Sequence, residues 1–496
     1  MLINLFSAQG WESWGLEHCP LIPERMPVLI DDDLLLEDGP AVPRATVAVN
    51  RWLRELPVSG APASGTWLAY ARIVRDWIDF LAGRDVGVFD CREVLKSALS
   101  GYAEYRAAGP VERRLAASTW NQHVSVLGSF YRWAVAGGQA QAEPFTYRAA
   151  RGMHAAAGQG REARVNAATR RRPKPHVTIR YLEPDFTRLF LDALAGLDPD
   201  GRADAGFAGR ELARNHAVGQ LAVATGLRLQ EFTFLLAYEI PPLPRVRTGA
   251  PVAFPVPSGV TKGRKFRTTW ISYEALATVH QYLALDRAAT ADSSAWSPPR
   301  AWGEALPVTD PDAAGGRISG ARRRWDTLTP AERRRLVAPG GGSCLVAVRA
   351  GGGPFTAWAS VFERTADRIR ACFEPRFPHV NPHRTRHTFA MRTLEYLVSG
   401  YYRQAAVLAA ATGDASGPDA ALALYLSRAD PLLVLRDLLG HSSVLTTEKY
   451  LSRLDTTRIF RDACERSGLG AAPAEDAAAG REAAAEFEGD DDGGWS

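Results

Sequence analysis

The sequence predicts a mainly α-helical protein that contains at least two folded units and one small antiparallel sheet. Apolar residues recur at helical spacing through much of residues 61–137 and 182–465. Between residues 251 and 272, the segments PVAFPV, GVTKGRK and FRTTWIS are typical of two short strands around a glycine-containing turn. The length of 496 residues is enough for about three domains.

The composition indicates an ordinary globular protein. The hydrophobic share of 46% and the charged share of 23% exclude wholesale disorder and a small disulfide-stapled scaffold. The five cysteines stand far apart without a CxxC pair, so we expect free thiols in a reducing compartment. Apolar runs end well before the ~18 residues of a membrane span, and the first residues lack a signal peptide's basic start. We therefore expect a cytoplasmic protein.

Charge is spread unevenly along the chain. The net charge is +4, but residues 475–496 hold eight acidic side chains and one arginine, which leaves +11 on the rest of the chain. A basic body indicates a polyanionic partner, and an ordinary solvated surface is the alternative.

The patterns divide the chain into five segments. Residues 1–60 show no sustained period and receive no assignment. Residues 61–137 predict a bundle of three helices, and residues 182–465 predict a larger helical domain that includes the hairpin. Residues 290–355 within it are expected to be rich in loops. The remaining segments are a basic linker at 138–181 and an acidic, disordered tail at 466–496.

The helices expected in the larger domain come from apolar periodicity and from turn residues at their ends. Their approximate ranges are 184–195, 210–225, 228–238, 274–286, 358–373, 383–398, 418–428 and 431–439, with one more after Thr446.

The linker carries a run of basic residues that can follow a phosphate backbone. A flexible, solvated tether is the alternative. The candidates for DNA contact are Arg170, Arg171, Arg172 and Lys174.

The segment ATGLRLQE, residues 224–231, places an arginine in the first turn of a predicted helix. Helix N-termini favour anions, and Arg228 can bind a phosphate with two donors. Glu231 lies three residues further on the same face and can orient Arg228. An ordinary surface pair is the alternative.

The hairpin turn TKGRK, residues 261–265, presents two lysines. Either Lys262 or Lys265 can reach into a cleft to deliver a proton or to contact a phosphate. Exposed turns often hold lysine and glycine, so a purely structural turn is the alternative.

The segment NPHRTRHTFAMRTL, residues 381–394, begins a helix at Pro382. His383 and Arg386 then share one face of its first turn. His383 and His387 have the spacing of zinc ligands, but the glutamate of an HExxH motif is missing. The two arginines between the histidines would repel a cation, so no metal site is predicted.

The segment LLGHSSVLTTEKYL, residues 438–451, contains a helix end at Gly440, then His441, and then Tyr450 in the next helix. The alternatives are a capping or core histidine and a half-buried aromatic residue.

Taken together, the order Arg, Lys, His-x-x-Arg, His, Tyr resembles the tyrosine recombinase (phage integrase) family. The resemblance is carried by ATGLR, TKGRK, PHRTRHTFA and LLGH with a tyrosine nine residues after the histidine, and by LGSFYRWAV in the N-terminal bundle. The stretches between Lys262 and His383 and between Arg386 and His441 are longer than in compact members.

The resemblance implies a helical SAM-like core-binding domain followed by a mostly α catalytic domain with a small antiparallel sheet, the DNA breaking-rejoining fold. It also implies site-specific DNA cleavage and rejoining through a 3′-phosphotyrosyl intermediate, without metal or cofactor. The residue types suit these roles, with Tyr450 as nucleophile, His383 as its base and Lys262 as the acid for the leaving hydroxyl. The donors to the phosphate oxygens would be Arg228, Arg386 and His441, with Glu231 in support and Lys265 as a DNA contact.

The partners implied are double-stranded DNA and further copies of the chain, as a dimer on each site and a tetramer on DNA. Accessory recombinases or directionality factors are further partners of such proteins, and a nucleoid-associated place in the cytoplasm is expected. The alternatives are a type IB topoisomerase, a non-catalytic DNA-binding relative, or a helical interaction protein whose motifs arose by chance. The sequence identifies neither the target site nor the kind of genetic element.

Overall fold

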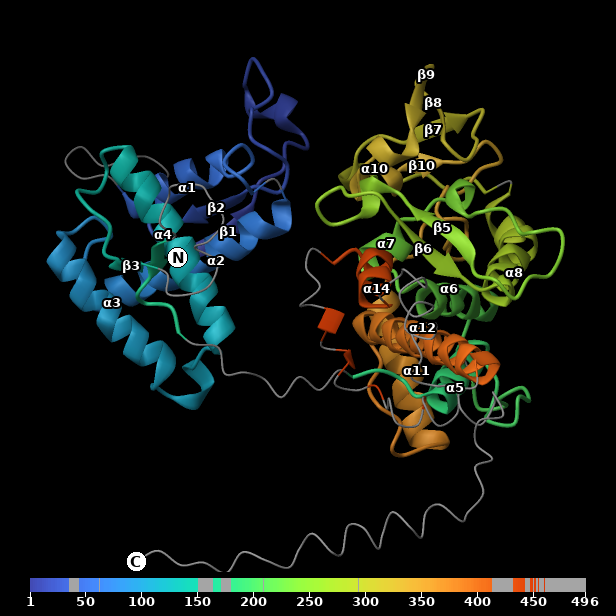
Figure 1. Cartoon of the computed structure of the whole chain (residues 1–496). Coiled ribbons are helices and arrows are strands. Elements are labelled where there is room, and N and C mark those ends of the chain that lie inside the picture. Colours follow the sequence, from blue (N-terminus) through green and yellow to red (C-terminus); the bar gives the residue numbers. More distant parts are fainter. Residues whose placement is uncertain are drawn as a thin grey trace, which may run out of the picture. The chain divides into compact units, whose positions relative to one another are not determined.

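The computed structural model describes residues 1–34, 44–61, 63–149, 164–170, 180–207, 209–292, 294–412, 431–441, 447–448, 450–451, 454 and 459. The chain forms two compact units, Met1–His176 and Val177–Ser496. Both are rich in helices, with short strands at their margins (Figure 1). Within the described residues, no helix combines the length and the apolar character that crossing a membrane requires.

In its described residues, unit 1 is a bundle of four helices built around aromatic side chains. Its helices are α1 (Ala45–Glu55), α2 (Ser64–Ala82), α3 (Arg92–Ala107) and α4 (Ala117–Ala136). Trp77, Tyr131 and Trp120 are completely buried between them, and Trp77 Nε1 donates to the Tyr131 hydroxyl at 2.9 Å. The three predicted helices are confirmed, and α1 adds a fourth from the unassigned segment.

An N-terminal hairpin covers one side of this bundle. Strands β1 (Leu2–Leu5) and β2 (Pro27–Ile30) pair antiparallel, and β2 packs on α1 and α2. Asn50 of α1 fixes the hairpin, because its side-chain amide bonds both the backbone N–H and the carbonyl of Leu29 at 2.8 Å. A buried amide with both partners satisfied stabilises this contact.

Part of the predicted linker belongs to unit 1 instead. Strands β3 (Tyr147–Ala149) and β4 (Arg164–Asn166) form an antiparallel pair. Trp120 Nε1 of α4 donates to the carbonyl of Ala168 at 2.7 Å, and the Asn121 side chain bonds both backbone groups of Arg170. These contacts join residues about fifty positions apart, so local periodicity gave no sign of them. Residues 171–179 lie outside the described part of the chain.

Unit 2 is a larger helical unit with the hairpin at one side. Strands β5 (Val252–Val256) and β6 (Arg267–Ile271) pair antiparallel, which confirms the predicted hairpin. Its helices are α5 (Pro184–Leu194), α6 (Leu212–Thr225), α7 (Leu229–Thr233), α8 (Tyr273–Tyr282), α9 (Ala288–Ala291), α10 (Pro330–Arg333), α11 (Trp358–Cys372), α12 (Pro382–Thr412) and α14 (Pro431–Leu439).

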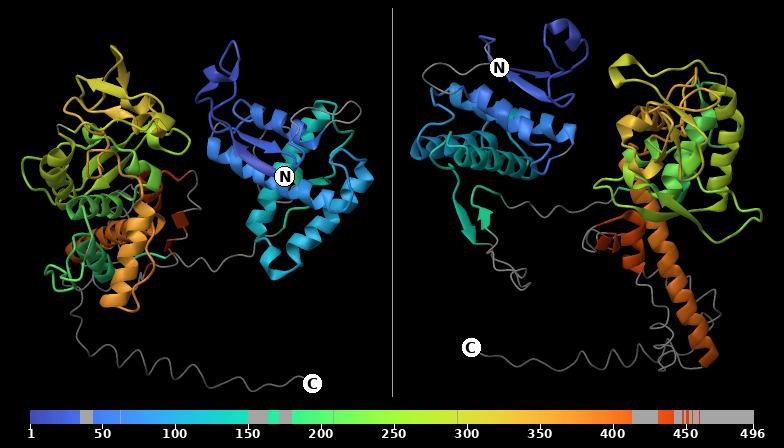
Figure 2. Two further views of the ribbon diagram at one scale, coloured as in Figure 1. Left: turned by 180° about the vertical axis from the view of Figure 1, so that it is seen from behind. Right: turned by 90° about the horizontal axis from the view of Figure 1, so that it is seen from above.

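Three helices differ from their predicted bounds by more than two residues. The helix predicted at 274–286 is α-helical only to Tyr282 and continues as a π-helix, Leu283–Arg287. The helix predicted at 228–238 ends at Thr233, and the chain then runs into a single 3-10 turn, Ala237–Glu239. Helix α12 continues to Thr412, well past residue 398, and Figure 2 shows it as one long continuous helix. The helix predicted at 418–428 lies outside the described residues.

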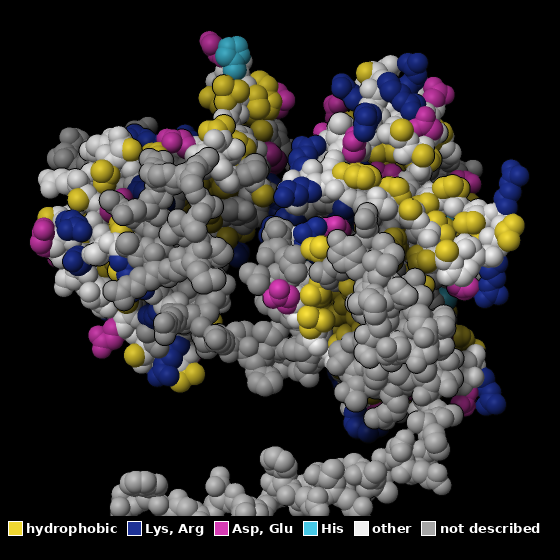
Figure 3. All heavy atoms as spheres, in the orientation of Figure 1, with side chains coloured by type: hydrophobic (Ala, Val, Ile, Leu, Met, Phe, Trp, Pro, Cys, Tyr) yellow, Lys and Arg dark blue, Asp and Glu magenta, His cyan; other side chains and the backbone are white. Residues whose placement is uncertain are grey.

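A four-stranded sheet stands where loops were expected at residues 290–355. Strands β7 (Leu306–Thr309), β8 (Gly315–Ile318), β9 (Ala321–Arg324) and β10 (Leu336–Val337) lie in the order β10-β7-β8-β9. All four strands are short, and β8 and β9 are rich in Gly and Arg, which hides them from propensity rules. Trp325 packs under them, and buried Arg333 bonds Glu239 through both terminal nitrogens at 2.6 and 2.8 Å. Figure 3 shows Lys and Arg side chains, interspersed with acidic ones, over this end of unit 2.

Candidate functional site

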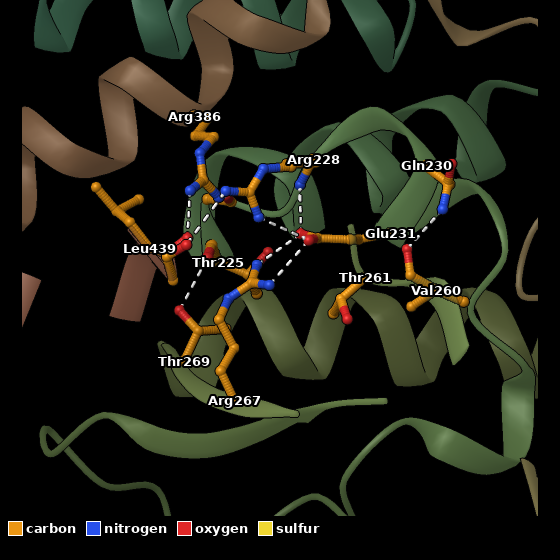
Figure 4. Close-up of polar contacts among 12 residues, drawn as sticks. Thr225, Arg228, Gln230, Glu231, Val260, Thr261, Arg267, Thr269, Arg386 and Leu439 are labelled. Carbon is orange, nitrogen blue, oxygen red and sulfur yellow. Dashed lines mark hydrogen bonds and ion pairs between the residues drawn. The ribbon is translucent and has the colours of Figure 1, made fainter. Parts of the chain in front are cut away.

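Glu231 is a buried carboxylate that holds two arginines. Arg228 caps the N-terminus of α7, where its backbone N–H donates to Glu231 Oε2 at 2.7 Å and its Nη1 to Oε1 at 3.0 Å. Arg267 approaches from β6 and donates two hydrogen bonds to the same carboxylate, at 2.8 and 2.5 Å (Figure 4). The predicted Arg228–Glu231 contact is therefore present, with a second arginine that the sequence analysis did not identify.

Gly226 allows this corner to form. Its φ of +62° is in the left-handed region, and a Cβ there would lie 2.3 Å from the ring of Phe389 on α12. A side chain at position 226 would thus separate α7 from α12.

Arg386 joins the corner from the first turn of α12. It is 3% exposed, and its Nη1 donates to the carbonyl of Gly226 at 2.6 Å. Its Nη2 donates to the carbonyl of Leu439, at the end of α14.

The C-terminus of α14 accepts hydrogen bonds from all three arginines. Arg267 Nε donates to the Leu438 carbonyl at 3.1 Å, and Arg228 Nη2 reaches the Gly440 carbonyl at 3.4 Å. The last carbonyls of a helix lack partners within the helix and carry partial negative charge, which suits guanidinium donors. The arginines thereby tie α7, β6, α12 and α14 into one site.

The charges at this corner leave an excess of positive potential. Burial raises the pKa of Glu231, but hydrogen bonds and charge from Arg267 and Arg228 outweigh it and lower that pKa overall. Burial, and then the charge of Arg228, lowers the pKa of Arg386 to about 9. At neutral pH the site thus holds three guanidinium cations and one carboxylate, an arrangement that attracts an anion.

Tyr450 lies beside this corner. Its side chain is buried, and its hydroxyl is 2.8 Å from Nδ1 of His387. Burial raises the pKa of Tyr450 to about 12, although Arg386 acts in the opposite direction. The phenol is therefore protonated at rest and needs a base before it can attack.

Three histidines surround this tyrosine and the arginines. His383 is exposed, with its ring centroid 4.3 Å from that of His387. His441 follows Gly440, and its Nδ1 lies 3.1 Å from the Thr447 hydroxyl. Burial, followed by the charges of Arg386 and Arg228, lowers the pKa of His441 to about 4, so this histidine is neutral at pH 7.

The two lysines of the hairpin turn face the same cavity. Lys262 and Lys265 are exposed, and they line a cavity of about 840 Å³ together with Arg228, Arg267 and His441. The structure thus places the predicted lysines on the wall of the space that the arginines and His441 also line.

Of the four linker residues predicted to contact DNA, only Arg170 lies within the described part of the chain. Arg170 packs over the Trp120 ring at 4.5 Å, and its Nη2 donates to the carbonyl of Ala103 at 2.7 Å. The side chain is thus held within unit 1, which argues against Arg170 as a free phosphate contact. Arg171, Arg172 and Lys174 lie outside the described residues.

The sequence analysis missed two residues of the site. Arg267 is the first residue of β6, beside the basic hairpin turn, and nothing in the local pattern distinguished it from an ordinary strand residue. His387 was considered only as a zinc ligand, although it is the histidine that contacts Tyr450.

Comparisons with known proteins support the assignment of the N-terminal unit. Residues 49–138 match the family model for the phage integrase N-terminal SAM-like domain. This segment is therefore a SAM-like domain of the phage integrase type, and the predicted tyrosine recombinase (phage integrase) resemblance is confirmed there. Proteins with curated descriptions give no match.

Several solved structures are similar to this chain. The XerH recombinase bound to difH substrate, a pre-cleavage complex, is 14% identical with a TM-score of 0.41, over 84% of this chain and 83% of that one. The Tn1549 transposon integrase in complex with transposon right end DNA is 14% identical with a TM-score of 0.43, over 84% and 98%. The XerA recombinase is 15% identical with a TM-score of 0.31, over 85% and 98%.

Proposed function

We propose that this protein cleaves and rejoins DNA at specific sites through a covalent phosphotyrosyl intermediate. The observation that carries the proposal is the grouping of Arg228, Arg386 and Arg267 on one carboxylate and one helix end, with Tyr450 beside Arg386. A surplus of fixed positive charge next to a protonated tyrosine suits attack on a phosphodiester.

The reaction follows from the charges that develop. Tyr450 gives its phenolic proton to a neighbouring histidine as its oxygen attacks the phosphorus. Negative charge grows on the non-bridging oxygens, where Arg228, Arg386 and His441 donate hydrogen bonds. The bond from phosphorus to the 5′ oxygen breaks, and Lys262 gives that oxygen a proton. The phosphotyrosyl bond keeps the energy of the broken bond, so another 5′-hydroxyl can reverse the step without an external energy source.

In this scheme Glu231 and Arg267 do not bind the phosphate directly. They hold Arg228 in place, and Arg267 also links β6 to α14 through the Leu438 carbonyl. We assign them positioning roles.

The partner in this proposal is double-stranded DNA, bound by the SAM-like domain as well as by unit 2. Strand exchange between two sites requires several active sites at once, which supports a dimer on each site and a homotetramer on DNA. Accessory recombinases or directionality factors would choose between integration and excision, and the protein would act at the nucleoid.

The test is the capture of the covalent intermediate. Duplexes retained by the protein from a random library supply a site, which is then nicked so that cleavage releases a short fragment and traps the adduct. We expect an adduct with wild-type protein and none with Tyr450→Phe. Tyr396→Phe is the matched control, because Tyr396 is 61% exposed on α12 and should leave cleavage intact.

Two results would contradict the proposal. The absence of an adduct with wild-type protein would refute the enzymatic function. An adduct that persists in Tyr450→Phe would refute the assignment of Tyr450 as the nucleophile. Relaxation of supercoiled DNA that lacks the selected site would instead favour topoisomerase activity.

A further inference from the structure

Two histidines, His383 and His387, lie one turn apart at the start of α12, and among the described residues His387 is the one that contacts Tyr450. His387 Nδ1 lies 2.8 Å from the Tyr450 hydroxyl, and the ring centroids are 5.7 Å apart. His383, the base suggested by the sequence, is exposed one turn earlier on α12, and its ring packs against that of His387.

The environment of Tyr450 makes this contact more than an incidental one. Tyr450 is 3% exposed and packs in an apolar cluster with Phe389, Leu394 and Leu435. A buried hydroxyl that finds no hydrogen-bond partner costs free energy, and His387 is the partner that the structure gives it.

The protonation state and the tautomer of His387 together set the direction of this hydrogen bond. Burial, and then the charges of His383, Arg386 and Arg384, lowers the pKa of His387 to about 4. His387 is therefore neutral at pH 7, and in the tautomer that carries its proton on Nε2 the phenol of Tyr450 donates to the lone pair on Nδ1. Among the described residues, His441 also interacts electrostatically with His387, and it is neutral at this pH too.

We propose that His387, rather than His383, accepts the phenolic proton of Tyr450 during attack. This inference rests on the proposed function. The O–H bond of Tyr450 breaks and an N–H bond forms at Nδ1 of His387, while the new O–P bond forms. The leaving 5′ oxygen takes its proton from Lys262, and religation returns the first proton from His387 to the phenolate.

A bound phosphate makes His387 a better base than it is in the free protein. In the proposed complex the anion sits against Arg386 and Arg228. The charge of Arg386 lowers the pKa of His387, and the charges of both arginines lower that of His441. Negative charge brought close to an imidazole raises its pKa. DNA binding would thereby bring the pKa of His387 closer to the working pH, where a general base is most effective.

The experiment measures single-turnover adduct formation on the nicked site between pH 5.5 and 9.5. We expect His387→Ala to slow the reaction by ~10²–10⁴-fold, with a deficit that shrinks as pH rises and hydroxide replaces the base. His387→Gln provides an amide oxygen that accepts the same hydrogen bond but takes no proton. It is expected to keep wild-type thermal stability and to remain slow, which separates proton transfer from positioning.

The matched control is His383→Ala, which removes the neighbouring histidine of the same turn. It is expected to keep the pH profile of the wild-type protein. Three results would overturn the proposal. The first is cleavage by His387→Ala at the wild-type rate or faster, which would mean that the contact only holds Tyr450 in place in the resting protein. The others are full activity of His387→Gln and a pH-dependent loss of rate in His383→Ala alone. Should His387→Ala fail to fold, His387→Gln carries the test.

The proposed function and this inference can fail separately. A wild-type adduct together with undiminished cleavage by the His387 variants overturns only the role of His387. No adduct from wild-type protein overturns both.

Discussion

Replacing Glu231 with alanine is expected to destabilise unit 2 and to disorganise the arginine corner. The glutamate is completely buried and accepts four hydrogen bonds, two from Arg228 and two from Arg267. Without it, the side chain of Arg267, which is 9% exposed, keeps its charge in a buried position near Arg386 and Arg228.

The size of the effect follows from the cost of an unpaired buried charge. Breaking a buried ion pair by removing one partner typically costs about 3–5 kcal/mol. For a domain of ordinary size this corresponds to a fall of roughly 6–20 °C in Tm, with the lower end more fitting for a unit as large as unit 2.

The assay is thermal denaturation of the full chain, with Glu274→Ala as the matched control. Glu274 also pairs with an arginine, Arg247, at 2.9 Å, but both side chains are exposed, so little change in Tm is expected. A Tm for Glu231→Ala no lower than that of Glu274→Ala would refute the reasoning that the buried carboxylate stabilises this corner.

The pH dependence gives a second measure of the same interaction. The folded-state pKa of Glu231 is lowered, so its contribution to stability is fully present above its unfolded pKa of ~4.3 and is lost as pH falls through the folded value. The difference in free energy of unfolding between wild type and Glu231→Gln is therefore expected to be constant near neutral pH and to shrink below about pH 4. A difference that grows in acid would contradict this sign.

Three further predictions concern the reaction and DNA binding. Arg228→Ala and Arg386→Ala are expected to slow cleavage by ~10²–10³-fold while gel-shift affinity stays near wild type, because phosphate contacts elsewhere carry most of the binding; near-normal cleavage by either variant would exclude that arginine from the site. Lys262→Ala should be slow on normal DNA and recover on a 5′-bridging sulfur substrate, whose leaving group needs little protonation. Lys265→Ala should show no such rescue, and the opposite pattern would exchange their roles. Neutralising the basic linker residues Arg170, Arg171, Arg172 and Lys174 should reduce the slope of log binding constant against log salt concentration by up to ~0.9 per lost phosphate contact. Arg170 is expected to contribute least, because it is held against Trp120.

Local pattern was enough to predict many of the helices and the hairpin. Helical periodicity identified α2, α3 and α4, and the strand–turn–strand pattern identified β5 and β6. The motif residues were found in the same way, because each sits at a helix start, a helix end or a tight turn, where the residue types are distinctive. The domain limits and the catalytic roles stay predictions.

Elements held together by distant contacts escaped the sequence analysis. The four-stranded sheet β10-β7-β8-β9 has strands of two to four residues, which are too short for an alternating pattern to be recognised. The β3–β4 pair depends on contacts such as Trp120 with Ala168, which lie far apart in the chain. In both cases tertiary packing, rather than local propensity, stabilises the strands.

The sequence by itself determined which chemical groups this protein brings to its site: arginines at 228 and 386, a lysine turn, histidines and a tyrosine after a helix end. Only the tertiary structure decided how they are used, with Arg267 completing the charge on Glu231 and His387 facing Tyr450. The physical reason is that helix and turn signals depend on neighbours within a few residues. A hydrogen bond between residues 387 and 450, or 231 and 267, depends on how whole helices and strands pack.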